Sequence, residues 1–198
     1  VARQTYAVGR RQLDRMLADK SRTAALEQDE KFAAKPPAVI LDVDETVLDN
    51  SAYQVRLIRR GETFATETWN DWCREARADA VPGALECTKY AAEQGVTVFY
   101  VTNRQHVVED ATRKNLEKLG FPIEEGEDVV LTKGEKKGWG SDKTPRRKLV
   151  AQKYRVLLQF GDNLGDFVGE TEGSPAKRLQ KAQKHKKRFG TTWFMLPN

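Results

Sequence analysis

The stretch AVILDVDETVLDNSAY, residues 38–53, decides the fold. It opens with a short apolar run that is typical of a buried strand, and the following turn carries four carboxylates, Asp42, Asp44, Glu45 and Asp49. Strands of a parallel sheet are covered on both faces and therefore read as continuous apolar runs. Ligands of open parallel sheets bind beyond the carboxyl ends of the strands. The stretch therefore predicts a functional site at the end of the first core strand.

Apolar runs and helical patterns alternate along the rest of the chain. Strands are predicted over 38–43, 96–101, 128–132, 155–160 and 191–196, and helices over 82–95, 107–120, 144–154 and 175–190. This alternation predicts a doubly wound, Rossmann-like α/β fold with a parallel sheet. The polar stretch from about 50 to 81 breaks the alternation, and we expect a small helical cap insertion there. Residues 1–35 predict an N-terminal helical arm before a core of residues 36–198.

The length, composition and charge of the chain limit the classes of protein to which it can belong. The 198 residues predict one domain, 39% of them are hydrophobic and 32% charged, and no apolar run approaches the roughly 20 residues that span a bilayer. The net charge of +5 is concentrated toward the C-terminal half, including the basic run 177–188. We interpret this run as a solvated helix face, because aromatic residues are not interleaved with it. Cys73 and Cys87 lack the spacing of a metal site. The sequence does not decide whether they form a disulfide with each other.

Polar residues that could form a site follow two more of the predicted strands. Thr102, Asn103 and Arg104 follow the second strand, and Asp162 and Asp166 follow the fourth. Carboxylates without His or Cys form a hard oxygen site that suits Mg²⁺ and not zinc. Paired carboxylates with a metal and a nearby lysine fit phosphoryl transfer, in which one Asp attacks phosphorus and a second handles the proton. An EF-hand is excluded, because the loop lacks Gly at its sixth and Glu at its twelfth position.

The motifs DVDETVLDN, VTNR, an upstream lysine and GDNLGDF resemble the four signatures of the haloacid dehalogenase (HAD) superfamily, four-aspartate type. With DNSAY, WNDWCREARADAVPGALE and RFGTTWFMLPN, the chain is more narrowly similar to the class C acid phosphatases, which are exported bacterial enzymes and often lipoproteins. The resemblance implies a Mg²⁺-dependent phosphomonoesterase that forms an aspartyl-phosphate and acts on 5′-nucleotides and aryl phosphates. It also implies a periplasmic or outer-membrane-anchored protein, and it leaves a homodimer open.

The resemblance also implies roles for the acidic residues. Asp42 would be the nucleophile and Asp44 the general acid and base, with the backbone carbonyl of Asp44 on Mg²⁺. Asp42 and Asp162 would be the side-chain ligands of the metal. Asp166 would act through water or by orienting its neighbours.

Phosphate and substrate contacts follow from the same resemblance. Thr102 and Asn103 would hold the phosphoryl oxygens together with Lys143, for which Lys148 is the alternative. Three aromatic side chains are expected near a nucleoside base or aryl group: Tyr53, Trp69 and Trp72. The competing interpretation is that they pack in the core of the cap. Glu45 and Asp49 are expected to cap or shape the turn.

Other functions stay open at this point. A different HAD-type phosphotransferase or nucleotidase would use the same residues with another acceptor or substrate. A basic nucleic-acid-binding protein would bind with a steep salt dependence and without Mg²⁺. We expect a small-molecule phosphomonoester as the partner, no nucleic acid, and membrane contact only through a lipid anchor outside this chain. The chain begins VARQTYAV, without Met or a signal-like segment, which is expected of a mature or trimmed form.

Overall fold

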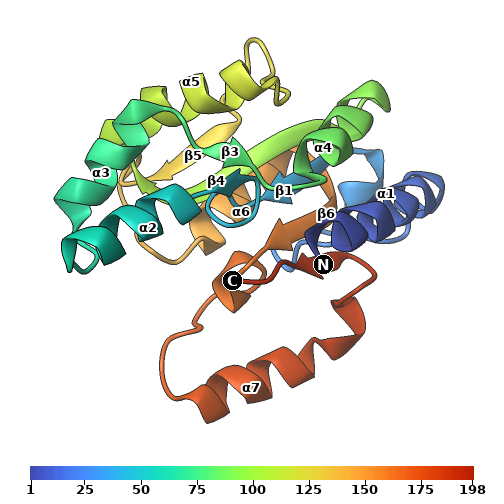
Figure 1. Cartoon of the computed structure of the whole chain (residues 1–198). Helices are drawn as coiled ribbons and strands as arrows, with labels where there is room; N and C mark the ends of the chain where they lie inside the picture. Colours follow the sequence, from blue (N-terminus) through green and yellow to red (C-terminus); the bar gives the residue numbers. More distant parts are fainter.

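A five-stranded parallel sheet forms the centre of the computed structural model, which describes all 198 residues (Figure 1). Its strand order is β5-β4-β1-β6-β7. The strands are β1 Pro37–Leu41, β4 Thr97–Gln105, β5 Val130–Lys133, β6 Arg155–Gly161 and β7 Trp193–Met195. The central strand β1 pairs with β4 from Ala38↔Thr97 to Leu41↔Tyr100, and on its other edge with β6. The prediction of a doubly wound parallel sheet is confirmed.

Seven α-helices connect or cover these strands. They are α1 Ala2–Ala18, α2 Ser51–Arg60, α3 Thr66–Glu75, α4 Ala84–Glu93, α5 Glu109–Leu119, α6 Thr144–Lys153 and α7 Pro175–Lys184. The helix predicted over 175–190 is shorter than expected, because α7 ends at Lys184 and a 3₁₀ turn follows over Lys186–Arg188. Helix α7 has no buried residue and lies apart from the other helices in Figure 1. None of the helices combines the length and apolarity needed to cross a membrane.

The N-terminal segment is packed into the hydrophobic core. Its helix α1 buries Tyr6, Leu13 and Met16 within the same cluster as the sheet, and it contacts α4, β6 and β7. A Cβ on Gly9 would lie 2.6 Å from the ring of Phe160, so the glycine allows the helix to approach β6. The predicted arm is thus continuous with the core.

The insertion between β1 and β4 is a helical cap closed by a small sheet. Strands β2 Leu48–Asp49 and β3 Asp79–Ala80 pair antiparallel at its base, an element that the sequence analysis did not predict. Helices α2 and α3 lie between these strands and sit together at one end of the main sheet (Figure 1). The pairing of β2 with β3 brings the cap beside the carboxyl ends of β1 and β4, where Asn50 contacts Asp44 and Asn70 contacts Gln105.

The two cysteines do not form the disulfide that the sequence left open. Cys73 in α3 and Cys87 in α4 are both free and buried. Burial raises the pKa of each thiol to about 12. They serve as small apolar side chains of the core.

Candidate active site

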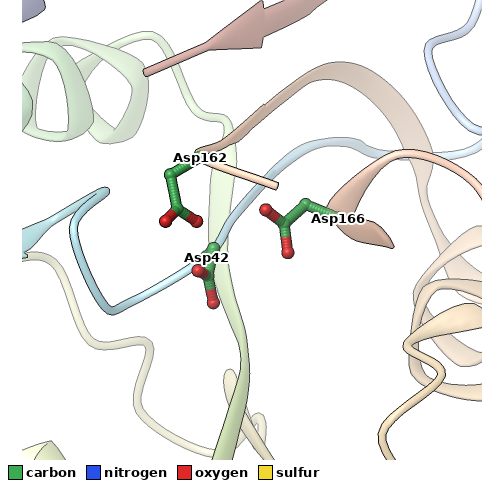
Figure 2. Close-up of side chains that lie close together, drawn as sticks. All are labelled: Asp42, Asp162 and Asp166. Carbon is green, nitrogen blue, oxygen red and sulfur yellow. The ribbon is translucent and has the colours of Figure 1, made fainter. Parts of the chain in front are cut away.

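Three aspartates converge at the carboxyl ends of β1 and β6. Asp42 follows β1 directly, and its backbone N–H donates to the carbonyl of Phe160 in β6 at 3.0 Å. Asp162 and Asp166 follow β6, and a carboxylate oxygen from each of the three aspartates lies within 4.8 Å of the others (Figure 2). Because β1 and β6 are adjacent parallel strands, residues at their ends share one edge of the sheet. The structure therefore brings these three aspartates to one place, as parallel topology leads one to expect.

Lys143 joins this cluster from the start of α6. Its ammonium group donates to Asp42 Oδ1 and, at 2.7 Å, to Asp166 Oδ1, and only 4% of the residue is exposed. Lys148, the alternative phosphate-binding lysine, lies one turn further along α6 and is exposed to solvent. The structure thus brings Lys143, and not Lys148, to the aspartates.

The loop GDNLGD holds Asp166 by a tight local geometry. Asp166 Oδ2 accepts from the backbone N–H of Asn163 at 2.8 Å, and Asn163 Oδ1 accepts from that of Gly165 at 3.0 Å, which is a capping box on a short 3₁₀ turn. A Cβ on Gly161 would lie 2.6 Å from Asp166 Cγ, so only glycine leaves room for this carboxylate. With Lys143 on Oδ1, both oxygens of Asp166 are engaged.

The charges in the cluster do not balance without a further cation. Burial raises the pKa of Asp42 well above its ordinary value although Lys143 opposes the shift, and burial with Asp166 raises the pKa of Asp162 to about 6. Burial disfavours the charge of Lys143, but Asp166 and Asp42 outweigh it and raise the lysine pKa. Three carboxylates face one ammonium group, and oxygen-only donors suit a hard divalent ion. The residues therefore fit a divalent metal site.

Asp44 lies outside this trio and is held by an arginine. Its Oδ1 accepts from Arg104 Nε at 3.0 Å, from Arg104 Nη2 at 2.8 Å and from Asn50 Nδ2 at 2.9 Å. Arg104 follows the second predicted strand, and no role was predicted for it. The signal in the sequence was the place of this arginine in the TNR triplet after the strand. The contact itself could not be read from spacing, because 60 residues separate Arg104 from Asp44.

A polar pocket of about 660 Å³ opens over these residues. Asp42, Asp44, Asn103 and Lys143 line it together with Asp162 and Asp166, and only one of its 14 lining residues is hydrophobic. Such a lining suits a small, strongly charged ligand better than an apolar one.

Thr102, in contrast, is fully buried and does not line the pocket. Its Oγ1 accepts from the backbone N–H of Arg104 at 3.0 Å. The neighbouring Asn103 reaches the pocket and is fixed by Arg146, whose Nη2 donates to Asn103 Oδ1 at 2.7 Å. Asn103 Nδ2 donates to the carbonyl of Ser141 at 3.0 Å, so both polar atoms of this amide are held by the protein. The phosphate contacts expected of Thr102 and Asn103 stay predictions.

Comparison with known proteins assigns the family. Residues 4–198 match the family described as HAD superfamily, subfamily IIIB (acid phosphatase). The chain belongs to this family. The class C acid phosphatase of Bacillus anthracis is 38% identical and superimposes with a TM-score of 0.84, over 100% of this chain and 76% of that one. The same enzyme with tungstate bound gives 36% identity with the same coverage and TM-score.

Plant relatives of the family are more distant. Acid phosphatase 1 of Solanum lycopersicum is 27% identical over 135 residues, which is 67% of this chain and 52% of that protein. The chain spans about half the length of the curated plant relatives that it matches.

The aromatic residues predicted as substrate contacts mostly pack inside the cap of this HAD family member. Tyr53 is buried and shares a hydrogen bond with Thr68 Oγ1 at 3.0 Å, and buried Trp72 donates its indole N–H to Asn50 Oδ1 at 2.8 Å. Trp69 is half-buried, with exposed Phe64 beside it at 6.1 Å between ring centroids. None of the three predicted aromatics lines the pocket, and the competing interpretation of core packing describes Tyr53 and Trp72.

Glu45 and Asp49 shape the turn that follows Asp44. Glu45 Oε1 accepts from the backbone N–H of Asn50 at 3.2 Å, and Asp49 Oδ1 accepts from that of Ser51 at 2.8 Å at the start of α2. Glu45 has a backbone φ of 54°, which is uncommon for a residue other than glycine. Burial, with Asp44 next to it, raises the pKa of Glu45 to about 7.

Proposed function

We propose that the protein is a Mg²⁺-dependent acid phosphatase that works through a phosphoaspartate at Asp42. The observation that carries this proposal is the contact of Lys143 with Asp42 and Asp166, beside Asp162, on the wall of a polar pocket. Phosphoryl transfer depends on positioning and on neutralising charge, and this cluster offers a carboxylate beside the Lys143 ammonium group and oxygen donors that would hold a divalent ion. The tungstate bound by the Bacillus anthracis enzyme supports an oxyanion as the ligand.

The chemistry takes two displacements at phosphorus. In the first, a carboxylate oxygen of Asp42 bonds to phosphorus, the bond to the leaving oxygen breaks, and Asp44 donates its proton to that oxygen. In the second, Asp44 takes a proton from water, the water oxygen bonds to phosphorus, and the bond to Asp42 breaks. Inorganic phosphate leaves and both carboxylates return to their starting state.

The surrounding residues bind the phosphoryl group. Lys143, Asn103 and Thr102 are the proposed donors to its oxygens. Mg²⁺, when held by Asp42, Asp162 and the backbone carbonyl of Asp44, with Asp166 binding through water or orienting the others, would supply positive charge to the phosphoryl oxygens.

We propose 5′-nucleotides and aryl phosphates as the substrate class. The nearly all-polar pocket accounts for the phosphoryl end, while half-buried Trp69 and exposed Phe64 are the aromatic side chains of the cap with surface free for a base or aryl ring. No nucleic acid partner is required. Export to the periplasm or outer membrane belongs to the same proposal and rests on family membership.

A phosphate-release panel tests this function. p-Nitrophenyl phosphate, 5′-nucleotides and sugar phosphates are assayed with Mg²⁺ and with a chelator, using the wild type, Asp42→Asn and the control Asp110→Asn, which changes an exposed aspartate of α5. We expect Mg²⁺-dependent release that Asp42→Asn abolishes and Asp110→Asn preserves. Release without any divalent ion, or full activity of Asp42→Asn, would overturn the proposal. Phosphate transferred to an added alcohol in preference to water would instead indicate a phosphotransferase.

A further inference from the structure

Arg104 is a buried cation that the two displacements do not use. It lies near the end of β4 with 1% of the residue exposed, and its guanidinium donates to three side chains. Two nitrogens reach Asp44, Nη1 reaches Thr112 Oγ1 at 3.2 Å, and Nη2 also reaches Asn50 Oδ1 at 3.3 Å. Burying an arginine is costly unless its planar fork is satisfied, and here the partner that satisfies it is Asp44.

The two oxygens of Asp44 are held very differently. Oδ1 accepts three hydrogen bonds, two from Arg104 and one from Asn50, at 2.8 to 3.0 Å. Oδ2 accepts only one, from Arg104 Nε at 3.3 Å. The oxygen with room for a proton is therefore Oδ2, and the carboxyl plane that aims it is fixed by the guanidinium fork.

The cap supports this arrangement from the opposite side. The indole of Trp72 donates to Asn50 Oδ1, which fixes the amide so that Nδ2 faces Asp44. The ring of Trp69 lies 5.6 Å from the guanidinium carbon of Arg104. Asp44 is thus held directly by Arg104 of β4 and by Asn50, and Trp69 and Trp72 of the cap contact these two residues in turn.

We propose that Arg104 is the positioning residue for proton transfer by Asp44, holding Oδ1 so that Oδ2 carries the proton to the leaving-group oxygen. This role rests on the proposed function. As the bond from phosphorus to the leaving oxygen breaks, the proton on Oδ2 moves to that oxygen and Asp44 becomes a carboxylate. The same oxygen takes a proton from water when the phosphoaspartate is hydrolysed.

The test compares leaving groups in the Arg104→Lys variant, which keeps the charge but loses the fork. p-Nitrophenolate leaves without protonation, whereas an alkoxide needs the proton, and kcat/KM reports the step that expels it. We expect kcat/KM to fall about 100-fold for glycerol 2-phosphate and less than about 5-fold for p-nitrophenyl phosphate. Rapid mixing with p-nitrophenyl phosphate should show a burst of product, because hydrolysis of the phosphoaspartate also needs Asp44. Equal losses on both substrates would overturn the positioning role.

Two further variants keep the result interpretable. Arg155→Lys is the control, since Arg155 is an equally buried arginine at the opposite end of β6 that donates to the carbonyls of Asp19 and Met16, and it should affect neither substrate selectively. If Arg104→Lys does not fold, Thr112→Val removes the acceptor of Arg104 Nη1, loosens the fork and should show a smaller loss of the same selectivity, whereas equal losses on both substrates overturn the role. A wild type without Mg²⁺-dependent release overturns the proposed function and the role with it. An active wild type with unselective variants overturns the role alone.

Discussion

Replacing Lys143 by methionine should destabilise the protein in a strongly pH-dependent way. Lys143 is the one ammonium group between the buried carboxylates of Asp42 and Asp166, so the variant leaves both without a cation. Removing one partner of a buried ion pair costs about 3–5 kcal/mol. For a chain of this size, 1 kcal/mol corresponds to about 2–4 °C, so we expect Tm to fall by about 6–20 °C at neutral pH without divalent ions.

The sign of the pH dependence follows from the carboxyl pKa values. Burial raises the folded-state pKa of Asp42, and loss of Lys143, which opposes that shift, raises it further. A carboxyl with a raised folded pKa holds its proton longer in the folded state, so stability is lost as pH rises from about 4 through the folded pKa. The penalty of Lys143→Met should therefore be large near about pH 7.5 and small near about pH 4.5.

Scanning calorimetry in EDTA at both pH values measures this penalty. Lys148→Met is the matched control, because it removes an exposed lysine from the same helix and should change stability by no more than about 0.5 kcal/mol. Added Mg²⁺ should restore part of the stability of Lys143→Met by supplying the missing positive charge. A Tm loss that is independent of pH, or equal in the two variants, would refute the electrostatic reasoning.

Three further outcomes are expected. Gly161→Ala should push the Asp166 carboxylate away, which should lower the free energy of unfolding by about 1–3 kcal/mol and weaken divalent-ion binding in calorimetry. The control Gly140→Ala, whose added Cβ has nothing within 4 Å, should change neither stability nor ion binding, and equal effects of the two variants would contradict the close-contact argument. Mg²⁺ affinity, titrated from about pH 8 to about pH 5, should weaken below about pH 6 as Asp162, whose pKa is raised to about 6, takes up a proton, and a flat profile would exclude Asp162 as a ligand. A thiol reagent should find no reactive cysteine in the native protein and both Cys73 and Cys87 after denaturation without reductant, and fewer thiols would indicate a disulfide.

The sheet and its acidic edge were predictable because their signals are local. Each core strand is a continuous apolar run, and parallel topology alone brings the residues after β1 and β6 together. Lys143 could be chosen over Lys148 from the resemblance, although the two differ by little more than one helical turn.

What the sequence did not indicate depends on contacts between distant segments. The antiparallel pair β2 and β3 has two residues in each strand, too few for an alternating pattern. The long side chain of Arg104 meets Asp44 across 60 residues, and no spacing rule describes such a contact. The orientation of the aromatic side chains also depends on distant contacts. The sequence allows Trp72 to face either the core or a ligand, and the structure shows its indole N–H donating to Asn50.

The most direct test of the account is to trap the phosphorylated enzyme. In Asp44→Asn the hydrolysis of the intermediate should be slow, because the base that activates water is gone while Asp42 and Lys143 remain. Acid quenching during turnover of p-nitrophenyl phosphate with Mg²⁺, followed by peptide mass spectrometry, should find one phosphoryl group on Asp42. A phosphoryl group on another residue, or full turnover with no covalent intermediate in this variant, would contradict the account.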